Sequence, residues 1–424
     1  MAAGFGMSAG LRVGYKQTEV GVIPADWEIV NLRRLSDFIT SGSRGWARYY
    51  ADRGALFVRS QNIRDGRLDF LDRQFVNPPA GSEGDRTRLK FSDFLITITG
   101  NSVGNVALVE QELGEAYISQ HVGLVRLSDP SRGAYIFRFL APGSIGNHQI
   151  FASQSGQSKP GLSLKDLQEF LVALPPVPEQ RAIAAALSDV DALLGGLDRL
   201  IAKKQGLKVA AMQQLLTGQT RLPGFSGEWE VKRLGELAEM GSGGTPLSAV
   251  PAYYDGKIPW VSISDMTKGG KIIESTERNL TALGLANSAA QIFPVGTVLY
   301  AMYASLGECS IAGVSLCTSQ AILGIRPKNN LNADFLYYYL TSLKSVVKTL
   351  GQQGTQSNLN KGMVQDFRFS LPSVPEQTAI AAVLSDMDTE LAALQARRSK
   401  TQALKQAMMQ ELLSGKIRLV EPRS

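Results

Sequence analysis

Residues 174–222 of this 424-residue chain occur twice, because residues 371–419 repeat them at a constant distance of 197 with no insertion. Of the 49 aligned positions, 28 are identical, so the two stretches are not alike by chance. Apolar residues in both copies step alternately by three and four positions, which is the spacing of a seam between paired helices. We therefore expect one long helix in each copy, and we expect the two helices to pack on each other. The seam residues are Ile183, Leu187, Val190, Leu194, Leu197, Ile201, Ile380, Leu384, Met387, Leu391 and Leu394.

The limits of the two helices are marked by proline at the start and glycine at the end. Each copy follows a proline-rich stop and ends at Gly218 or Gly415. These signals predict helices of about 40 residues, roughly 60 Å long at 1.5 Å per residue. Gly195 and Gly196 in the first helix each cost roughly 1 kcal/mol relative to alanine, which permits local bending there. The stripe shifts near residue 203, as in a stutter, and restarts with Leu207, Ala211 and Leu215 in one copy and Leu404, Met408 and Leu412 in the other.

The duplication extends beyond these helices into the rest of the chain. Trp27 pairs with Trp229, the phrase FVRSQNIRDG with WVSISDMTKG, and ISQHVGLVR with TSQAILGIR, at offsets between 200 and 204. Short apolar and β-branched runs bounded by Gly, Pro, Asp and Ser predict strands in both bodies. The sequence therefore predicts an α/β (α+β) fold with two duplicated mixed domains. The expected strands cover residues 56–58, 94–99, 122–127, 258–263, 297–300 and 322–325, and further helices cover residues 134–140 and 333–350.

The duplication also predicts four parts along the chain. The first globular domain covers residues 1–173, with a loose N-terminus over residues 1–14. The first long helix occupies residues 174–222, and the second globular domain residues 223–370. The distal long helix and a C-terminal tail make up residues 371–424.

Composition narrows the class of protein only a little. The net charge of +6 and the pI of about 9.2 fit a nucleic-acid-binding protein, but they also fit many proteins that bind none. Cys309 and Cys317 have no His or further Cys nearby, which indicates reduced thiols rather than a metal site or a disulfide. No apolar run reaches 18 residues, and residues 1–10 lack the pattern of a signal peptide. We expect a cytoplasmic protein with no membrane contact.

Polar positions that differ between the two copies are the candidates for function, because positions that agree serve the shared scaffold. The differing stretches mix Arg, Gln, Asn, Ser, Lys and aromatic residues on Gly-rich loops, which are the side chains that bind base edges and phosphates. Arg44, Arg59, Gln61 and Asn62 are the foremost candidate base readers, although ordinary solvated loops are an alternative interpretation. The DNA-binding candidates are Ser43, Arg44, Trp46, Arg48, Tyr49, Arg59, Gln61, Asn62, Arg64, Asn101, Ser102, Asn105, Thr245, Tyr253, Ser262, Ser264, Lys268, Tyr303 and Ser305.

Catalytic motifs are missing from the sequence. An adenine methyltransferase needs [D/N]PP followed by an aromatic residue that stacks on the flipped base, together with a Gly-rich loop after a strand. The tetrad NPPA at residues 77–80 lacks the aromatic residue and is interpreted as a turn. No GxxxxGK[S/T] loop occurs, and His121 and His148 are the only histidines, which leaves little for a His-based metal or acid-base site. We predict no catalytic residue and no metal site, while a single-chain methyltransferase and a coiled-coil adaptor without DNA contact are the competing hypotheses.

Several phrases together resemble the specificity subunit (HsdS) of type I restriction-modification enzymes, essentially from end to end. These phrases are TEVGVIPADWEIVNL, GSGGTP with YYDGKIPWV, AYISQHVGLVR, and the duplicated VPEQ block that closes with LLTGQTRL or LLSGKIRL. The resemblance implies two target-recognition domains separated by two long antiparallel helices that form a coiled coil, with pseudo-two-fold symmetry. It also implies that each domain reads one half of an asymmetric bipartite site in double-stranded DNA.

The resemblance further implies the partners and cofactors of a larger complex. The two helices would act as a ruler between the half-sites and would dock two methyltransferase subunits (HsdM). Those subunits would hold S-adenosylmethionine, and restriction subunits (HsdR) that use ATP and Mg would join for cleavage. This chain itself would be a non-catalytic DNA-recognition subunit with no cofactor of its own.

Overall fold

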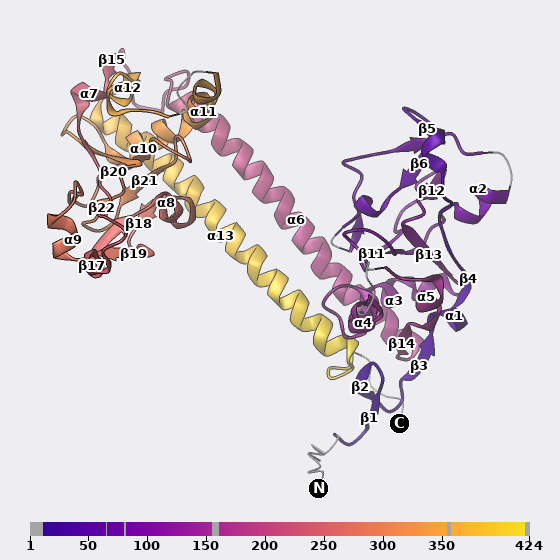
Figure 1. Cartoon of the computed structure of the whole chain (residues 1–424). Coiled ribbons are helices and arrows are strands. Elements are labelled where there is room, and N and C mark those ends of the chain that lie inside the picture. Colours follow the sequence, from indigo (N-terminus) through magenta and orange to yellow (C-terminus); the bar gives the residue numbers. More distant parts are fainter. Residues whose placement is uncertain (1–11, 65, 80–81, 155–160, 354–357, 420–424) are drawn as a thin grey trace, which may run out of the picture. The chain divides into compact units, whose positions relative to one another are not determined.

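The computed structural model describes residues 12–64, 66–79, 82–154, 161–353 and 358–419. The chain divides into two compact units, and the division cuts both long helices. Unit 1 comprises Met1–Leu197 and Arg397–Ser424, and unit 2 comprises Asp198–Ala396. Each unit therefore holds one globular body and one half of each long helix (Figure 1). Most of the predicted loose N-terminus, and the tail beyond residue 419, lie outside the described residues.

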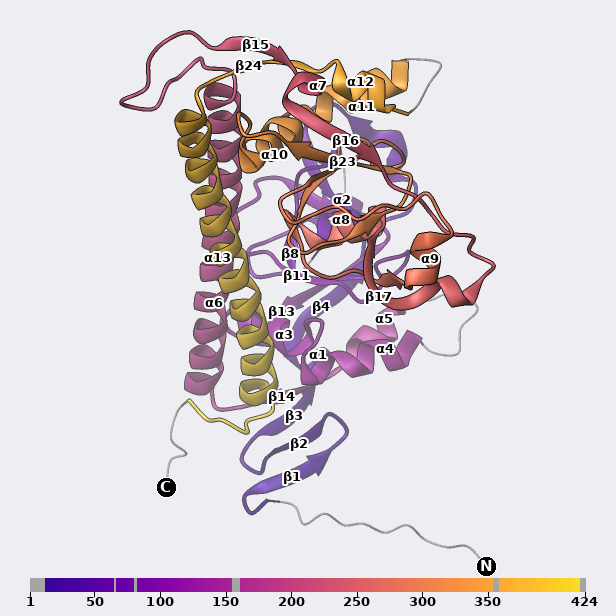
Figure 2. The same cartoon turned by 90° about the vertical axis from the view of Figure 1, so that its left-hand side faces the viewer.

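The two long helices are α6 (Val177–Leu215) and α13 (Val374–Leu413). In unit 1, Ile183 near the start of α6 shares a buried core with Leu413 at the end of α13. In unit 2, the end of α6 shares a core with the start of α13 in the same way. Within each unit the two helices therefore pack side by side and run antiparallel (Figure 2). The helix pairing predicted from the duplicated stripe is confirmed.

The seam between the helices changes character along its length. Leu207 and Leu404, with which the stripe was expected to restart, are 47% and 55% exposed. Charged side chains cross the seam there, because Lys208 pairs with Asp388 in unit 2 and Lys405 pairs with Asp191 in unit 1. Of the seam residues, Ile183, Leu187, Leu194, Leu197, Ile201, Ile380, Leu384 and Leu391 are buried, and Val190, Met387 and Leu394 are half-buried.

The duplicated phrases VPEQ and GxxRL meet at the helix ends. In unit 2, Arg221 beyond α6 donates to Glu376 at the start of α13 at 2.5 and 2.7 Å. In unit 1, Arg418 beyond α13 donates to Glu179 at the start of α6, also at 2.5 and 2.7 Å. Both glutamates are 1% exposed. We call these two pairs the end clamps, since each joins the end of one helix to the start of the other.

The body of unit 1 contains two four-stranded sheets, in the orders β11-β10-β13-β4 and β12-β6-β9-β5. Three two-stranded pairs accompany them, in which β1 pairs with β2, β3 with β14 and β7 with β8. The strands are β1 (Tyr15–Thr18), β2 (Gly21–Pro24), β3 (Glu28–Asn31), β4 (Ser36–Ser41), β5 (Tyr50–Ala51), β6 (Ala55–Val58), β7 (Ile63–Arg64), β8 (Arg67–Leu68), β9 (Phe75–Val76), β10 (Phe94–Thr97), β11 (Val106–Leu108), β12 (Ala116–Ile118), β13 (Val122–Leu127) and β14 (Leu171–Leu174).

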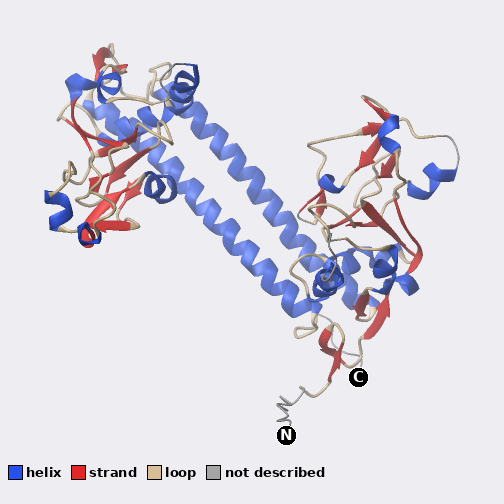
Figure 3. Cartoon of the chain, viewed as in Figure 1, coloured by secondary structure: helices blue, strands red, loops and turns tan. Residues whose placement is uncertain are grey.

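The central strands of unit 1 are apolar on both faces, because each face meets a different core. Phe94 and Ile96 of β10 face the core shared with the long helices, whereas Leu95 faces a second core on the other side of the sheet. Helices cover the first face (Figure 3). The short helices are α1 (Leu32–Leu35), α2 (Ser82–Thr87), α3 (Gly133–Leu140), α4 (His148–Gln154) and α5 (Leu164–Glu169), with 3-10 turns η1 (Trp46–Tyr49), η2 (Ser60–Asn62), η3 (Pro130–Arg132) and η4 (Ile145–Asn147).

The body of unit 2 repeats this plan. A five-stranded sheet has the order β16-β23-β20-β21-β18, a three-stranded sheet the order β19-β17-β22, and β15 pairs with β24. The strands are β15 (Glu230–Arg233), β16 (Ala238–Ser242), β17 (Tyr254–Val261), β18 (Ile272–Ile273), β19 (Arg278–Leu280), β20 (Val298–Ala301), β21 (Cys309–Ala312), β22 (Cys317–Thr318), β23 (Ile322–Pro327) and β24 (Arg368–Leu371). The helices are α7 (Leu234–Leu237), α8 (Ile263–Gly269), α9 (Ala282–Ala286), α10 (Ala333–Ser342), α11 (Lys344–Gln353) and α12 (Lys361–Gln365), with the turn η5 (Pro251–Tyr253).

The predicted fold class, two duplicated mixed α/β domains with two long paired helices, is confirmed. The bounds of several expected elements shift by one or two residues, and two elements differ more clearly. The strand expected over residues 258–263 ends at Val261, because Ser262 caps α8 with its side chain. The helix expected over residues 333–350 is two helices that part at Leu343. No helix in the described part of the chain is long and apolar enough to cross a membrane.

Candidate nucleic-acid interface

One edge of the unit 1 body gathers the loops that the sequence singled out. Because β13 pairs antiparallel with both β4 and β10, the end of β4, the end of β10 and the start of β13 lie at the same edge. The end of β6 joins them through the N–H of Ser119, which donates to the carbonyl of Val58 at 2.9 Å. We call this the loop edge. It brings together residues 42–49, 59–64 and 98–105.

Unit 2 builds its loop edge with the same backbone contacts. The N–H of Ser319 donates to Val261 at 2.9 Å, which matches the contact between Ser119 and Val58. The loop edge of unit 2 collects residues 243–250, 262–268 and 302–307. Two further backbone hydrogen bonds recur. The N–H of Gly42 donates to the carbonyl of Val122 at 3.3 Å in unit 1, as the N–H of Gly243 donates to Ile322 at 3.2 Å in unit 2. The N–H of Ile98 donates to His121 at 2.9 Å, as the N–H of Met302 donates to Ala321 at 2.9 Å.

The first loop of unit 1 exposes arginines and buries its tryptophan. Arg44 and Arg48 are exposed, and the guanidinium of Arg48 lies 4.8 Å from the ring centre of half-buried Tyr49. Trp46 is 1% exposed and stacks on Phe57 with ring centres 5.7 Å apart. Ser43 is also buried, at 8% exposure. Both side chains serve the interior of the body in this structure, and their contact with DNA stays a prediction.

The second loop of unit 1 is held by Asn62 from within. Asn62 is 2% exposed, and its side chain accepts from the N–H of Arg59 at 3.0 Å and donates to the carbonyls of Asp69 and Asp72 at 2.9 Å each. A buried amide with these three contacts has little capacity left for a base. Asn62 organises the loop in this structure, and base reading by Asn62 stays a prediction.

Asp72 faces the two remaining readers predicted in this loop. Its carboxylate pairs with Arg59 at 3.0 Å and accepts from the side-chain amide of Gln61 at 2.5 Å. The hydrogen bond from Gln61, followed by the charge of Arg59, lowers the pKa of Asp72. Arg64 is exposed, and its Nε donates to the Gln61 carbonyl at 2.8 Å. Asp72 therefore engages the side chains of Arg59 and Gln61 directly, and the charge of Arg64 also lowers its pKa.

The third loop of unit 1 is a turn between β10 and β11. Asn101 is exposed and Ser102 is half-buried. Asn105 is half-buried, and its side-chain amide donates to the carbonyl of Ile63 at 3.1 Å, which ties this turn to the second loop. Gly104 ends the turn at φ +88°, a left-handed conformation that favours glycine.

The loop edge of unit 2 carries hydroxyl and aromatic side chains instead of arginines. Thr245 is exposed and its hydroxyl bonds to the side chain of Gln320. Ser319 and Gln320 match Ser119 and Gln120 of unit 1, and we call this shared dipeptide the Ser-Gln phrase. Tyr303 is 40% exposed, and Ser305 is half-buried. Tyr253 is half-buried and packs against the core of Tyr254 and Trp260.

The α8 segment of unit 2 uses most of its predicted readers for its own structure. The hydroxyl of Ser262 caps the helix by accepting from the N–H of Asp265 at 3.4 Å, and Ser264 is half-buried in the first turn. Lys268 is exposed and pairs with Glu277 at 2.5 Å. Of the three predicted readers in this segment, Lys268 is the one with an exposed charged group. To bind a phosphate, it would leave the exposed carboxylate of Glu277.

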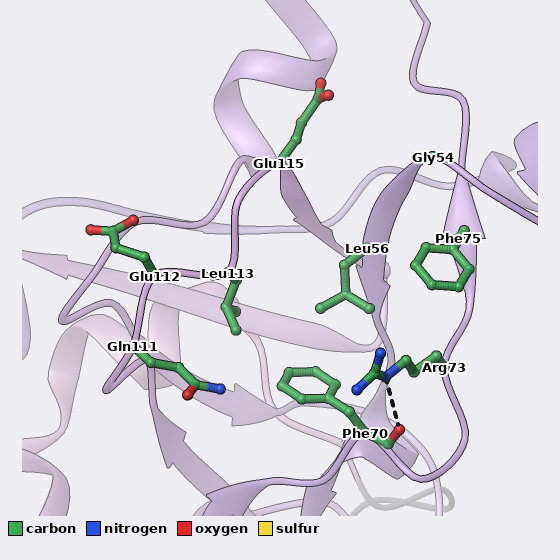
Figure 4. A pocket seen from close by; sticks show the side chains of 9 residues that line it. All are labelled: Gly54, Leu56, Phe70, Arg73, Phe75, Gln111, Glu112, Leu113 and Glu115. Atoms are coloured by element: carbon green, nitrogen blue, oxygen red, sulfur yellow. Dashed lines mark hydrogen bonds between the residues drawn. The ribbon is translucent and has the colours of Figure 1, made fainter.

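Sequence reasoning missed Asp72, Gln320 and the hollow beside the second loop of unit 1. The hollow has a volume of about 340 Å³, and Figure 4 shows Leu56 and Phe70 facing it while Arg73 donates to the Phe70 carbonyl at 3.3 Å. Its remaining lining is Gly54, Phe75, Gln111, Glu112, Leu113 and Glu115. The two glutamates make it unsuitable for a phosphate. No local sequence signal marks these features, because they depend on contacts between distant segments.

Comparison with known proteins identifies the class. The sequence profile of the type I restriction modification DNA specificity domain matches residues 47–202 and 226–403. The chain therefore belongs to this family, and the resemblance seen in the sequence is confirmed.

Three relatives document the likeness. A protein of Methanocaldococcus jannaschii that carries the name of the MjaX specificity subunit of a type I restriction enzyme is 24% identical over 96% of this chain and 97% of the relative. The MjaIX specificity subunit of the same organism is 31% identical over 38% of each chain. A solved structure described as the basis of complex assembly and conformational transition of the type I R-M system covers 93% of this chain and 99% of its own, with 22% identity and a TM-score of 0.60. This last likeness supports the fold.

Proposed function

We propose that this chain is the DNA-sequence-specificity subunit of a type I restriction-modification complex, and that each loop edge reads one half of an asymmetric bipartite site in double-stranded DNA. The observation that carries the proposal is the repetition of one backbone frame with different exposed side chains. The backbone hydrogen bond from Ser119 to Val58 in unit 1 is matched by that from Ser319 to Val261 in unit 2. Matching backbone contacts that carry different side chains suit two half-sites of different sequence.

The exposed residues differ in the chemistry they offer to DNA. In unit 1, Arg44, Arg48 and Arg64 offer cationic forks that can pair with guanine edges or phosphates. In unit 2, Thr245 and Tyr303 offer hydroxyl groups and an aromatic face, which bind bases without an added charge. The first half-site would therefore be bound with a larger electrostatic contribution than the second.

The remaining candidates take graded roles in this proposal. Arg59, Gln61 and Lys268 would bind DNA by leaving their acidic partners, and Asn101, Ser102 and Ser305 would contact it from the turns. Tyr49, Asn105, Tyr253, Ser262 and Ser264 would support the loops from half-buried positions. The domain limits of residues 1–173 and 223–370 also belong to the proposal.

The proposal includes partners that supply the chemistry. Two methyltransferase subunits (HsdM) would bind the paired helices and hold S-adenosylmethionine, and restriction subunits (HsdR) would use ATP and Mg. This chain would be non-catalytic, and a subunit that acts on cellular DNA would work in the cytoplasm. Family membership and the fold shared with a type I assembly support this division of labour.

The decisive experiment compares the chain alone with the chain plus its methyltransferase subunits. Each sample is incubated with unmodified genomic DNA and S-adenosylmethionine, and modified adenines are mapped by sequencing. We expect methylation only when both proteins are present, at one motif with two unlike halves and a constant spacer. Methylation by the chain alone would favour a single-chain methyltransferase, and a gel-shift assay of the same samples that finds no DNA binding in either would favour a structural adaptor.

A further inference from the structure

The first loop of the unit 1 loop edge is held by an arginine that the comparison of the two sequence copies did not single out. Arg86 of α2 donates through Nη1 to the carbonyl of Ser41 at 2.8 Å and through Nη2 to the hydroxyl of Ser43 at 3.0 Å. Its Nη1 also bonds to the hydroxyl of Thr40. Three anchor points, at the last two residues of β4 and at Ser43 just beyond it, thus meet one guanidinium. The next residue along is the exposed Arg44.

A glutamine holds the corresponding loop of unit 2. The side-chain amide of Gln291 donates to the carbonyl of Ser242, the last residue of β16, at 2.8 Å. A Cβ built on Gly241 would lie 2.3 Å from this same amide nitrogen. The amide therefore occupies space that is open only because residue 241 has no side chain.

Strand register shows that these two arrangements are equivalent. Ser41 lies opposite Gly123 in unit 1, and Ser242 lies opposite Leu323 in unit 2. Because the phrases ISQHVGLVR and TSQAILGIR align these partner residues, Ser41 corresponds to Ser242 and Thr40 to Gly241. The penultimate residue of the strand and its anchor differ together between the units. Thr40 accompanies Arg86, whereas Gly241 accompanies Gln291.

The other side of each loop is walled by the shared Ser-Gln phrase. A Cβ on Gly42 would meet the carbonyl of Ile118 at 2.2 Å, and a Cβ on Gly243 would meet the carbonyl of Ser319 at 2.3 Å. Backbone carbonyls form this wall in both units, and in unit 2 the hydroxyl of Thr318 adds to it, 2.2 Å from a Cβ on Gly243, so a side chain is excluded at either glycine. The anchoring side chain on the opposite side is the part that differs.

We infer that Arg86 and Gln291 are positioning residues for sequence recognition, which hold Arg44 and Thr245 where they meet the bases. The inference rests on the proposed function. Base discrimination requires the reading atoms to be held within about 0.5 Å of their productive position, so a loop that loses its anchor keeps its reader but loses accuracy. Each anchor acts on its own half-site.

The test uses the full chain reconstituted with its methyltransferase subunits on a randomised site library. The Arg86→Ala variant is expected to lower discrimination about tenfold at one or two base pairs of the first half-site, and to leave the second half unchanged. The Gln291→Ala variant is the mirror control and is expected to relax only the second half. The double variant Arg86→Gln with Thr40→Gly, which imitates the glutamine and glycine combination of unit 2, is expected to regain most of the lost discrimination, whereas Arg86→Ala with Thr40→Gly is not.

The outcomes separate this inference from its alternatives. If Arg86→Ala weakens binding to all sequences equally and reduces the salt dependence by about one counterion, Arg86 contacts a phosphate and the inference is wrong. Urea midpoints of the variants show whether a loss reflects unfolding, and the double variant then decides between positioning and stability. If the wild-type complex methylates no bipartite motif, the proposed function fails. If it does, and Arg86→Ala alters no base preference, only the positioning role fails.

Discussion

The loop edges of the two units share a frame and differ in charge. The backbone contact of Ser119 in unit 1 has its counterpart at Ser319 in unit 2, at the same 2.9 Å. Upon this frame unit 1 exposes Arg44 and Arg64, whereas unit 2 exposes Thr245 at the first loop. Backbone hydrogen bonds do not depend on side-chain identity, so the frame tolerates new side chains at the loop tips. One scaffold can thereby carry two recognition surfaces.

The end clamps show the same principle where no recognition is involved. In unit 2, Trp229 donates through Nε1 to Glu376 at 3.2 Å, beside the contacts from Arg221. In unit 1, Arg418 also reaches Asp26 at 3.0 and 2.9 Å. The hydrogen bond from Arg418 lowers the pKa of Asp26 below its ordinary 3.8, so its stabilisation is present above that pH and is lost as the pH falls through the lowered value. Both clamps share the pair of arginine and glutamate, but the third residue is Trp229 in unit 2 and Asp26 in unit 1.

The largest expected effect comes from breaking one clamp. The Glu376→Gln variant leaves Arg221 half-buried without its full charge partner, which is expected to lower the free energy of unfolding by about 3 kcal/mol. The matched Glu179→Gln variant is expected to lose less, because Arg418 keeps Asp26. Urea unfolding measures both. The exposed pair of Glu230 and Lys232 supplies the control, since Glu230→Gln should leave the urea midpoint unchanged. Equal losses in the two clamp variants would contradict the role given to Asp26.

The second prediction separates the two loop edges. The Arg44→Ala variant is expected to relax one base position of the first half-site by about 1 to 3 kcal/mol, and Thr245→Ala one position of the second half-site. Methylation of a randomised library by the reconstituted complex reports both halves at once. Relaxation of both halves by either variant would show that the two loop edges do not read independently.

The third prediction compares the two long helices at matched positions. Gly196 of α6 corresponds to Ala393 of α13 at the offset of 197. A Cβ added to Gly196 meets no atom within 4 Å, so Gly196→Ala is expected to raise the free energy of unfolding by about 1 kcal/mol through helix propensity alone. The reverse change, Ala393→Gly, is expected to lower it by a similar amount. A destabilising effect of Gly196→Ala in urea unfolding would mean that this glycine has a role beyond propensity.

The smallest expected effect concerns the acidic partner of the second loop. The Asp72→Asn variant removes the carboxylate that pairs with Arg59, which should strengthen DNA binding irrespective of sequence by about twofold to threefold at low salt. Titration of fluorescent non-cognate DNA at several salt concentrations measures this change. In unit 2, Glu277→Gln releases Lys268 and is the matched variant. Unchanged affinity in both would indicate that these carboxylates do not compete with DNA.

Periodicity and duplication allowed much of this architecture to be predicted from the sequence. A helix seam repeats over neighbouring turns, so residues from Ile183 to Ile201 reveal it locally. The comparison of the two copies then located the loops, because each position of one copy can be compared with the aligned position of the other. The resemblance of the VPEQ and GxxRL phrases led to the family, although it did not reveal that Glu179 and Arg418 form a clamp across 239 positions.

The sequence by itself determined the duplication, the paired helices, the strand-rich bodies and the family, because each is written in spacing or identity along the chain. Only the tertiary structure decided what individual polar residues do. Asn62 and Arg59 are near neighbours in the same loop, but Asn62 is 2% exposed and holds the loop while Arg59 faces a carboxylate. Arg86 bonds to Thr40 across 46 positions, and Leu207 is 47% exposed beside the ion pair of Lys208 and Asp388. Burial and partnership depend on contacts between distant segments, which local patterns of residue type do not encode.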